Sequence, residues 1–398
     1  MSSRFDQFGS IKKITLGVVS CVLTLILIEI LLRMTNYQRK YSAWIWQGEE
    51  RNSASLHYWD LSDSRIYAAL PDVDMGEIFH SDAFGFRYSS HSGQLRDTTQ
   101  KQYVIISVGD SFTFGHNVKP DDAYPAQLER LLRKSGLNIL VHNAGVLGYG
   151  ADQEYSYIID ELIPRFHPDL IVWNVNINDI YDSNASCLYK KSENGFLKLP
   201  GWLNSLYVQG YVFRHIPKKI YDTRLFDVII NIPTFITHQQ IFTVGCTQPA
   251  GNPDTVLFDA FSQKIRFFAY EMKRQYPNQK ILFTLTPFKS NLTNDTAQTA
   301  DTILSMKSAA SILELFRSLP YPWKDANALM KEYIDRMNTQ EGNGKASEMN
   351  PMSLFITDKE FPHDAAHLNE EGNAVWAASM VNAVHTYLNT DEITNKGI

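Results

Sequence analysis

Three side chains in this sequence have the types that nucleophilic attack on a carbonyl carbon requires. Ser111 stands in the segment Gly-Asp-Ser, and Asp364 precedes His367 by three positions. A serine hydroxyl is a poor nucleophile until a base removes its proton, and a carboxylate orients that base and stabilises its cation. Residues three apart can share one side of a single turn, so one short segment can deliver both the base and its carboxylate partner. These three residues are therefore the candidates for serine-based acyl transfer.

Such a reaction also needs hydrogen-bond donors directed at the oxyanion that forms on the carbonyl, each worth on the order of 3 kcal/mol. The backbone N–H groups of Ser111 and Gly148 and the side-chain amide of Asn178 can supply three. Position 148 is a glycine, and a side chain there would crowd the reacting carbonyl of the substrate. Each feature also has a structural interpretation, because Gly-Asp-Ser can cap a helix, a glycine can form a turn and an asparagine can satisfy a loop backbone. Their joint placement favours catalysis.

Short apolar runs alternate with helical spacing from residue 103 onward, and these elements place the candidate residues. Strands that are apolar throughout and separated by helices indicate a parallel sheet covered on both faces. In such sheets, functional groups gather beyond the carboxyl ends of the strands. Ser111, Gly148 and Asn178 each follow a predicted strand. The predicted strands are 103–108, 138–142, 169–175 and 280–286, and the predicted helices are 122–132, 152–162, 259–274, 296–319, 323–337 and 369–388.

Four blocks in this order resemble the SGNH hydrolases, which are also called the GDSL family. The blocks are GDSFTFG, NAGVLG, NIND and DAAHLN. The resemblance covers roughly residues 83 to 388. Two further segments, DAFGFR and DDAYPAQLE, resemble the corresponding segments of family members that carry an N-terminal membrane helix. Phe112 replaces the leucine of the usual motif, which is a conservative apolar change.

This resemblance implies a fold and a role for each candidate residue. The expected fold is α/β, a flavodoxin-like three-layer α/β/α arrangement with a mostly parallel sheet. Ser111 would be the nucleophile, His367 the base and Asp364 its partner. The oxyanion donors would be Ser111, Gly148 and Asn178, with no cofactor. The insertion after Asn178 leaves the substrate class open, because loops at that end of the sheet shape the pocket.

The last block also has an alternative interpretation as a zinc site. His363 and His367 are four positions apart, as are the histidines of the zinc-protease motif His-Glu-x-x-His. Asp364 stands where that motif has glutamate and is one methylene shorter. Pro362 immediately precedes the motif, and no third ligand is evident. We therefore expect no metal.

The N-terminal part contains the apolar run ITLGVVSCVLTLILIEILL over residues 14–32, with one acid at Glu29. A membrane-crossing helix needs about 20 such residues. A cleaved signal peptide would have a shorter apolar region than this run. The residues that end at Cys21 resemble a lipoprotein box, but the apolar run continues well beyond Cys21, which a lipid anchor would not need. A short tail before a single span usually leaves the larger part outside the cytoplasm. We expect a single-pass protein of a bacterial inner membrane with a periplasmic catalytic domain.

The expected domain organisation follows from this anchor. It comprises a cytoplasmic tail over 1–13, a transmembrane segment over 14–33, a lead-in over 34–82, an SGNH hydrolase-like domain over 83–390 with an insertion at about 182–255, and a tail over 391–398. Cys187 and Cys246 would lie in an oxidising compartment, where they can form a disulfide. They would pair with each other, because the third cysteine, Cys21, is in the membrane. Two unpaired thiols are the alternative, because no sequence determines the distance between their Cα atoms.

Composition narrows the partners of the chain. Its 37 lysines and arginines and 43 aspartates and glutamates give a net charge of -6, which works against nucleic-acid binding. The expected partners are the membrane and an ester substrate such as an acylated polysaccharide. The leading hypothesis is a membrane-anchored serine esterase acting on ester groups, above all O-acetyl groups, of an extracytoplasmic substrate. The alternatives are an O-acyltransferase of cell-envelope glycans that uses the same residues, and a non-catalytic glycan-binding module.

Overall fold

The structure is a computed structural model. It describes residues 2–34, 59–62, 64–74, 79–88, 102–199, 225, 253–292, 300–340, 349–356 and 367–394. The chain divides into two compact units, one of residues 1–51 with 202–244 and one of residues 52–201 with 245–398. The part of the predicted lead-in from residue 52 onward thus belongs to the same unit as the candidate site residues.

The first unit contains helix α1 (Ser2–Met34), which includes the apolar run. Residues 15–34 have a mean hydropathy of 2.5, and none of this stretch is buried. Arg33 Nε donates a 2.7 Å hydrogen bond to Glu29 Oε1 one turn earlier, so the single acid of the run is paired on its own helix. By length and composition α1 is able to span a membrane. An N-terminal signal sequence has the same length and apolar composition.

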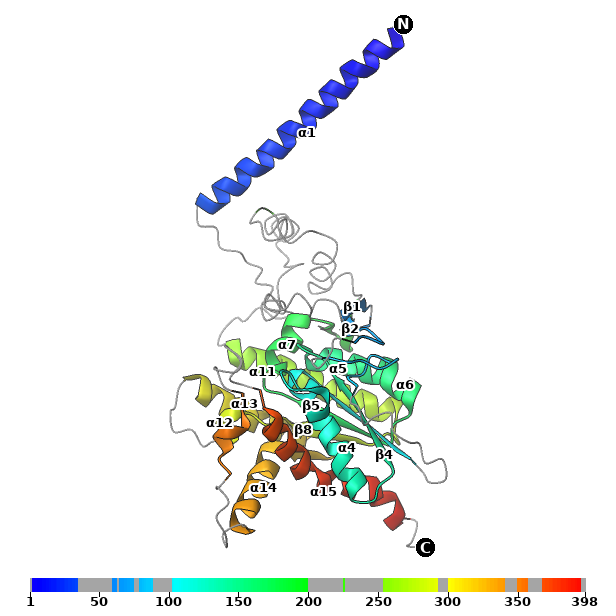
Figure 1. The fold of residues 1–398 in the computed structure, drawn as a ribbon, viewed down its shortest axis with the longest axis vertical. Coiled ribbons are helices and arrows are strands. Elements are labelled where there is room, and N and C mark those ends of the chain that lie inside the picture. The colour runs from blue at the N-terminus through cyan, green and yellow to red at the C-terminus, as the bar shows by residue number, and fades with distance from the viewer. Residues whose placement is uncertain are drawn as a thin grey trace. The chain divides into compact units, whose positions relative to one another are not determined.

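The second unit is built on a five-stranded sheet in the order β4-β3-β5-β8-β9. Figure 1 labels β4, β5 and β8 of this sheet. The strands are β3 (Tyr103–Gly109), β4 (Ile139–Gly145), β5 (Leu170–Val175), β8 (Ile281–Leu285) and β9 (Trp323–Asp325). All four neighbouring pairs are parallel. Every residue of β5 and of β8 is buried, as the uninterrupted apolar runs predicted. The expected parallel sheet is confirmed.

The strand β9 corrects one prediction. A helix was expected over 323–337, but its first three residues pair with β8 and the helix α14 begins only at Ala326. The N–H of Phe283 donates a 3.0 Å hydrogen bond to the carbonyl of Pro322, which places the following residues along the sheet edge. Three residues are too few to show an alternating pattern, so only the pairing with β8 reveals the strand.

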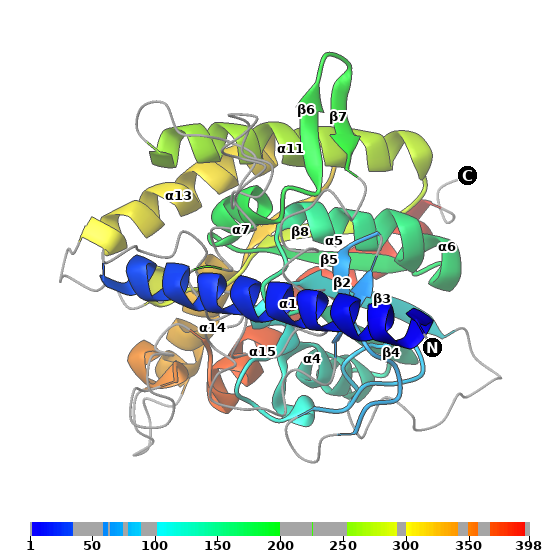
Figure 2. The same ribbon diagram turned by 90° about the horizontal axis from the view of Figure 1, so that it is seen from above.

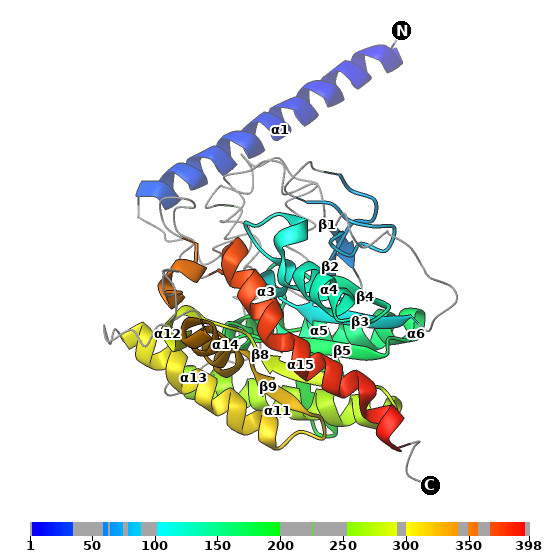
Figure 3. The same ribbon diagram turned by 60° about the horizontal axis from the view of Figure 1, so that its bottom comes forward.

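Helices cover both faces of the sheet and make three layers (Figure 2). One face carries α5 (Ala151–Tyr157), α11 (Pro253–Gln275) and α13 (Ala300–Arg317). The other carries α4 (Tyr124–Lys134), α14 (Ala326–Gln340) and α15 (Glu370–Thr394). On this second face α15 lies beside α4 and α14 (Figure 3), and the ring of Tyr124 stacks on Trp376 at a centroid distance of 3.9 Å. The three-layer α/β/α prediction is confirmed.

Shorter elements connect these layers. They are α3 (Ser111–Phe114), the 3-10 turn η3 (Pro120–Asp122), the π-helical turn η4 (Ile158–Leu162), α6 (Ile163–Phe166), α7 (Asp179–Ser186), β6 (Tyr189–Ser192), β7 (Gly195–Lys198), α12 (Lys289–Leu292) and the 3-10 turn η6 (Pro351–Leu354). The expected helix over 152–162 therefore continues as a wider turn. Pro164, which lacks the N–H of a regular helix, follows that turn.

An antiparallel hairpin precedes the sheet, where the sequence indicated only an irregular lead-in. Its strands are β1 (Trp59–Ser62) and β2 (Ile66–Ala69). Arg65 Nη2 lies 2.6 Å from Glu161 Oε2, and Gln153 Nε2 donates a 2.9 Å hydrogen bond to the carbonyl of Arg65. Ser156 Oγ donates to the carbonyl of Ser64 at 2.7 Å. The hairpin is thus attached to α5 and to the turn that follows it.

The DAFGFR segment contributes a buried cation to the same unit. The guanidinium of Arg87 donates to the carbonyls of Phe114 and Gly115 through Nη1 and to that of Val118 through Nη2 at 2.6 Å. Its N–H also bonds to the carbonyl of Asn143 on the edge strand β4. Arg87 therefore holds the loop that leaves α3, the helix that begins at Ser111.

Candidate active site

Ser111 is the first residue of α3, directly beyond the carboxyl end of β3. The helix is capped by Asp110, whose Oδ1 accepts a 2.9 Å hydrogen bond from the N–H of Phe112. A side chain at Gly109 would place its Cβ 2.2 Å from Thr113 Oγ1, so only glycine allows the strand to turn this sharply into α3. Because Asp110 performs the capping, the hydroxyl of Ser111 is not needed for it.

His367 reaches Ser111 from the far end of the chain. Its Nε2 lies 2.8 Å from Ser111 Oγ, which is hydrogen-bond distance between residues 256 positions apart. The backbone at His367 is held because its carbonyl accepts a 2.9 Å hydrogen bond from the N–H of Ile356. The imidazole lies 4.5 Å from the ring of Phe112 and 5.0 Å from that of His116. The structure thus brings together the two residues that sequence analysis selected as nucleophile and base.

The other predicted partners of this pair are only partly described. Asp364 and His363 lie outside the described residues, so the carboxylate role and the zinc alternative are not tested. His367 directs Nε2 toward a hydroxyl, and the described residues include no group of three metal-binding side chains. Cys187 is disulfide-bonded. Its predicted partner Cys246 lies outside the described residues, and the pairing stays a prediction.

Gly148 lies in a tight turn beyond β4. The N–H of Tyr149 donates a 3.2 Å hydrogen bond to the carbonyl of Val146, which closes a four-residue turn with Leu147 and Gly148 at its centre. Gly148 has φ +70°, whereas Leu147 does not have a positive φ. This combination is typical of a type II turn, which favours glycine at its third position. Among the hydrogen bonds of the described residues, none uses the N–H of Gly148 or that of Ser111.

Asn178 is held beside the segment of Asp110 and Ser111 by its own side chain. Its Nδ2 donates a 2.9 Å hydrogen bond to Asp110 Oδ2 and keeps a second N–H. The N–H of Asn176 donates to Asp179 Oδ2 at 2.8 Å and closes the loop in which Asn178 stands. Ser111 and Asn178 thus share Asp110 as a neighbour.

Asp110 is fully buried and was not among the functional residues predicted from the sequence. Burial raises the pKa of its carboxyl, while the hydrogen bonds from Asn178 and Phe112 and the charge of His367 act in the opposite direction. The position of Asp110 inside the Gly-Asp-Ser block was the available signal. The contacts of its carboxylate with both Phe112 and Asn178 depend on the tertiary structure, which brings the loop of Asn178 beside it.

Further buried acids lie behind Asp110. Burial raises the pKa of Glu154, Asp179 and Asp182 well above their ordinary values, and the charge of Asp110 raises all three further. Glu154 is held by Trp173, whose Nε1 donates a 2.6 Å hydrogen bond to its Oε2. Carboxyls in such surroundings favour the neutral form. The acids beside Asp110 are therefore polar but weakly charged.

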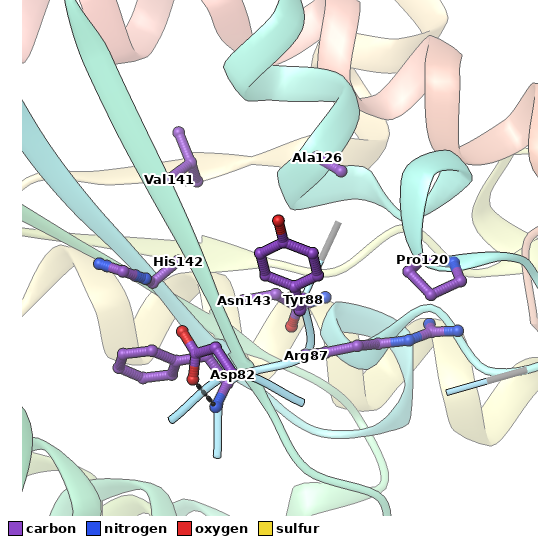
Figure 4. A pocket seen from close by; sticks show the side chains of 9 residues that line it. Asp82, Arg87, Tyr88, Pro120, Ala126, Val141, His142 and Asn143 are labelled. Atoms are coloured by element: carbon purple, nitrogen blue, oxygen red, sulfur yellow. Dashed lines mark hydrogen bonds between the residues drawn. The ribbon is translucent and has the colours of Figure 1, made fainter. Parts of the chain in front are cut away.

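A separate pocket lies at the edge of the sheet (Figure 4). It is lined by Asp82, Phe86, Arg87, Tyr88, Pro120, Ala126, Val141, His142 and Asn143. Neither Ser111 nor His367 contributes to it. His142 stacks on Phe86 at a centroid distance of 4.5 Å, and burial lowers its pKa to about 4.

Comparison with solved structures finds enzymes that are similar to this chain. The psychrotrophic esterase EstA from Pseudoalteromonas sp. is 9% identical, with a TM-score of 0.36 and coverage of 72% of this chain and 99% of that chain. The acetyl xylan esterase AlAXEase is 15% identical, with a TM-score of 0.38 and coverage of 71% and 99%. The acetylxylan esterase Axe2 from Geobacillus stearothermophilus is 14% identical, with a TM-score of 0.38 and coverage of 71% and 94%. No family model and no curated protein matches the chain.

Proposed function

We propose that this chain is a serine esterase that forms an acyl-enzyme at Ser111. The observation that supports this most directly is the 2.8 Å distance between Ser111 Oγ and His367 Nε2. A serine that merely caps a helix bonds to the backbone N–H groups of that helix. Here Asp110 accepts the capping bond, and the Ser111 hydroxyl faces an imidazole instead. That arrangement is the one in which a base can remove the proton of a nucleophile.

The acylation step uses the groups around Ser111. His367 Nε2 takes the hydroxyl proton while Oγ attacks the ester carbonyl carbon, and the carbonyl oxygen becomes an oxyanion. The N–H groups of Ser111 and Gly148 and the second N–H of Asn178 Nδ2 would donate to that oxyanion. When the intermediate collapses, the bond to the alcohol oxygen breaks and His367 returns its proton to the leaving alcohol. The acyl group remains on Ser111.

Deacylation reverses these roles with water. His367 removes a proton from a water molecule, the hydroxide oxygen attacks the acyl carbon, and the bond to Ser111 Oγ breaks as the proton returns to it. The acid is released and the hydroxyl is restored. In this proposal Asp364 holds Nδ1 of His367 and stabilises the imidazolium in both half-reactions.

We also propose that α1 anchors this enzyme in a bacterial inner membrane, with the second unit in the periplasm. Its length and apolar composition support the anchor. A tethered esterase with this orientation acts on envelope material close to the membrane, and O-acetyl groups of a polysaccharide are the substrate class we propose.

The test uses the full-length chain in detergent. Wild-type protein should hydrolyse p-nitrophenyl acetate and be labelled on Ser111 by a fluorophosphonate, as mapped by peptide mass spectrometry. Ser111→Ala should abolish labelling, and His367→Ala should lower kcat at least about 1000-fold. Ser353→Ala is the control, because the Ser353 hydroxyl, which this change removes, donates to the carbonyl of Asn350 in its own turn. Turnover retained by folded Ser111→Ala protein would refute the proposal.

A competition experiment decides how the acyl group leaves Ser111. The esterase proposal predicts that free acetate accumulates at the same rate with or without an added oligosaccharide. Formation of an acetylated oligosaccharide at the expense of acetate would instead identify an O-acyltransferase that uses the same acyl-enzyme.

A further inference from the structure

We propose that Tyr67, on the hairpin ahead of the sheet, is the residue that orients the oxyanion donor Gly148. The inference rests on the proposed function. It concerns a peptide bond, that between Leu147 and Gly148, and the side chain that holds it. The hydroxyl of Tyr67 donates a 2.9 Å hydrogen bond to the carbonyl of Leu147, 80 positions further along the chain.

The two ends of one peptide unit explain how this contact reaches the site. The carbonyl of Leu147 and the N–H of Gly148 belong to the same planar, trans peptide group, so they point in opposite directions. A hydrogen bond that fixes the carbonyl therefore also fixes the direction of the N–H. A donor to the carbonyl also polarises the group and makes its N–H a stronger donor.

The turn makes this control necessary. Type I and type II turns differ mainly by a rotation of the central peptide through about 180°. In this turn the central peptide is the one between Leu147 and Gly148, and the φ of +70° at Gly148 belongs to the type II orientation. Glycine can adopt either orientation. Without a partner for its carbonyl the peptide is free to flip, and the Gly148 N–H would then point away from the substrate.

The position of Tyr67 is itself determined by its surroundings. Tyr67 is 5% exposed, and its ring meets that of Tyr149 edge-on at 5.1 Å. The hydroxyl of Tyr149 donates to the carbonyl of Tyr67. Ile66, the preceding residue, is fully buried with φ +77°. A β-branched residue adopts that conformation only where the surrounding structure imposes it.

The Tyr67 hydroxyl lies close to Gly148 as well as to the carbonyl of Leu147. A Cβ added at Gly148 would lie 3.2 Å from the Tyr67 hydroxyl oxygen. An alanine there would push against the hydroxyl that holds the turn, in addition to its strain at positive φ. Tyr67 and Gly148 should therefore act as one unit.

The experiment compares Tyr67→Phe with Ser156→Ala in full-length protein. Tyr67→Phe keeps the ring and removes only the hydroxyl. Ser156→Ala removes the hydrogen bond between the same hairpin and α5, together with the contacts of that hydroxyl to Asp160 and Lys198, all away from the turn. We measure kcat and KM for p-nitrophenyl acetate, the rate of labelling by the fluorophosphonate, and Tm for each variant.

Tyr67→Phe should lower kcat and the labelling rate about tenfold, less than the 100- to 1000-fold that follows complete loss of a donor, with KM changed less than about threefold. Ser156→Ala should lower Tm by a similar amount and leave kcat unchanged. In a Gly148→Ala background, Tyr67→Phe should have little further effect, because both changes act on one peptide.

Two results would overturn this inference. One is an unchanged labelling rate in folded Tyr67→Phe protein, and the other is an equal loss of kcat in both single variants at equal loss of Tm. Failure of the proposed function has a different signature, since wild-type protein itself would then resist the fluorophosphonate. That result would overturn the inference too, because no oxyanion would need to be bound.

Discussion

The carboxylate of Asp110 and the side-chain amide of Asn178 are joined by a hydrogen bond of 2.9 Å, from Nδ2 to Oδ2. The second oxygen, Oδ1, accepts the N–H of Phe112 in the helix that Ser111 begins. One buried carboxylate thus holds both the turn that presents Ser111, the proposed nucleophile, and the amide that we propose as an oxyanion donor. Neither group can move without disturbing the other.

Replacement of Asp110 by asparagine should separate these two functions. Asparagine keeps one oxygen for the N–H of Phe112, but it would turn an N–H toward the amide of Asn178, so the bond between them is lost. We expect kcat for an acetyl ester to fall about 10- to 100-fold, with KM nearly unchanged. Asp82→Asn is the matched control, since Asp82 also accepts backbone N–H bonds but lies at the sheet edge. Equal kcat values for wild type and Asp110→Asn would contradict this assignment.

Glu154→Gln should raise the free energy of unfolding relative to wild type, and this gain should grow as the pH rises. Burial raises the folded pKa of Glu154 well above 4.5. Above that pH the unfolded chain loses a proton that the folded protein retains, so wild-type stability falls by up to about 1.4 kcal/mol per pH unit. Glutamine can still accept the bond from Trp173 and has no such dependence. Urea unfolding at pH 5 and pH 8 measures the difference, which should be larger at pH 8.

Asp152→Asn should have the opposite sign although it lies on the same helix. Lys264 is buried and lies 3.5 Å from Asp152 Oδ2, and burial lowers its pKa while Asp152 counters that effect. Removal of the carboxylate leaves a buried ammonium without its ion-pair partner, although the carbonyl of Ser183 still accepts a hydrogen bond from it. Loss of such a partner costs about 3–5 kcal/mol. The same urea measurements at pH 7 should show a lower unfolding free energy than in wild type. A neutral or stabilising result would show that Lys264 is not held by this pair.

His142→Phe should reduce the acid sensitivity of folding. The folded pKa of His142 is about 4, because burial disfavours the charged ring, against 6.5 for the unfolded chain. Between these values the unfolded chain binds a proton that the folded protein does not. Stability is therefore lost as the pH falls, by about 2 kcal/mol from pH 7 to pH 5.

Phenylalanine at position 142 keeps the stacking on Phe86 and removes the titrating group. The drop in Tm from pH 7 to pH 5 should be several degrees smaller in the variant than in wild type. An identical drop in both proteins would mean that His142 titrates normally in the folded state.

Most of the sheet could be predicted from residues that are close together in the chain. The strands at 103–109 and 170–175 lie within a residue of their predicted bounds, because buried parallel strands consist of short uninterrupted apolar runs. The hairpin at 59–69 and the strand at 323–325 were not predicted. Their residues show no periodic pattern of their own, and partners far along the chain determine their conformation.

The sequence by itself determined the residue types that the chemistry needs, the strands after which they stand, and the apolar helix at the N-terminus. These features depend on side-chain identity and local periodicity, which a linear chain records directly. Only the tertiary structure decided that Ser111 Oγ and His367 Nε2 lie 2.8 Å apart. It also decided that Asn178 donates a hydrogen bond to Asp110 and that Tyr67 donates one to the carbonyl of the peptide that precedes Gly148. Each of these contacts joins residues between 68 and 256 positions apart, and such pairs meet only when layers of helix and sheet pack around a common core.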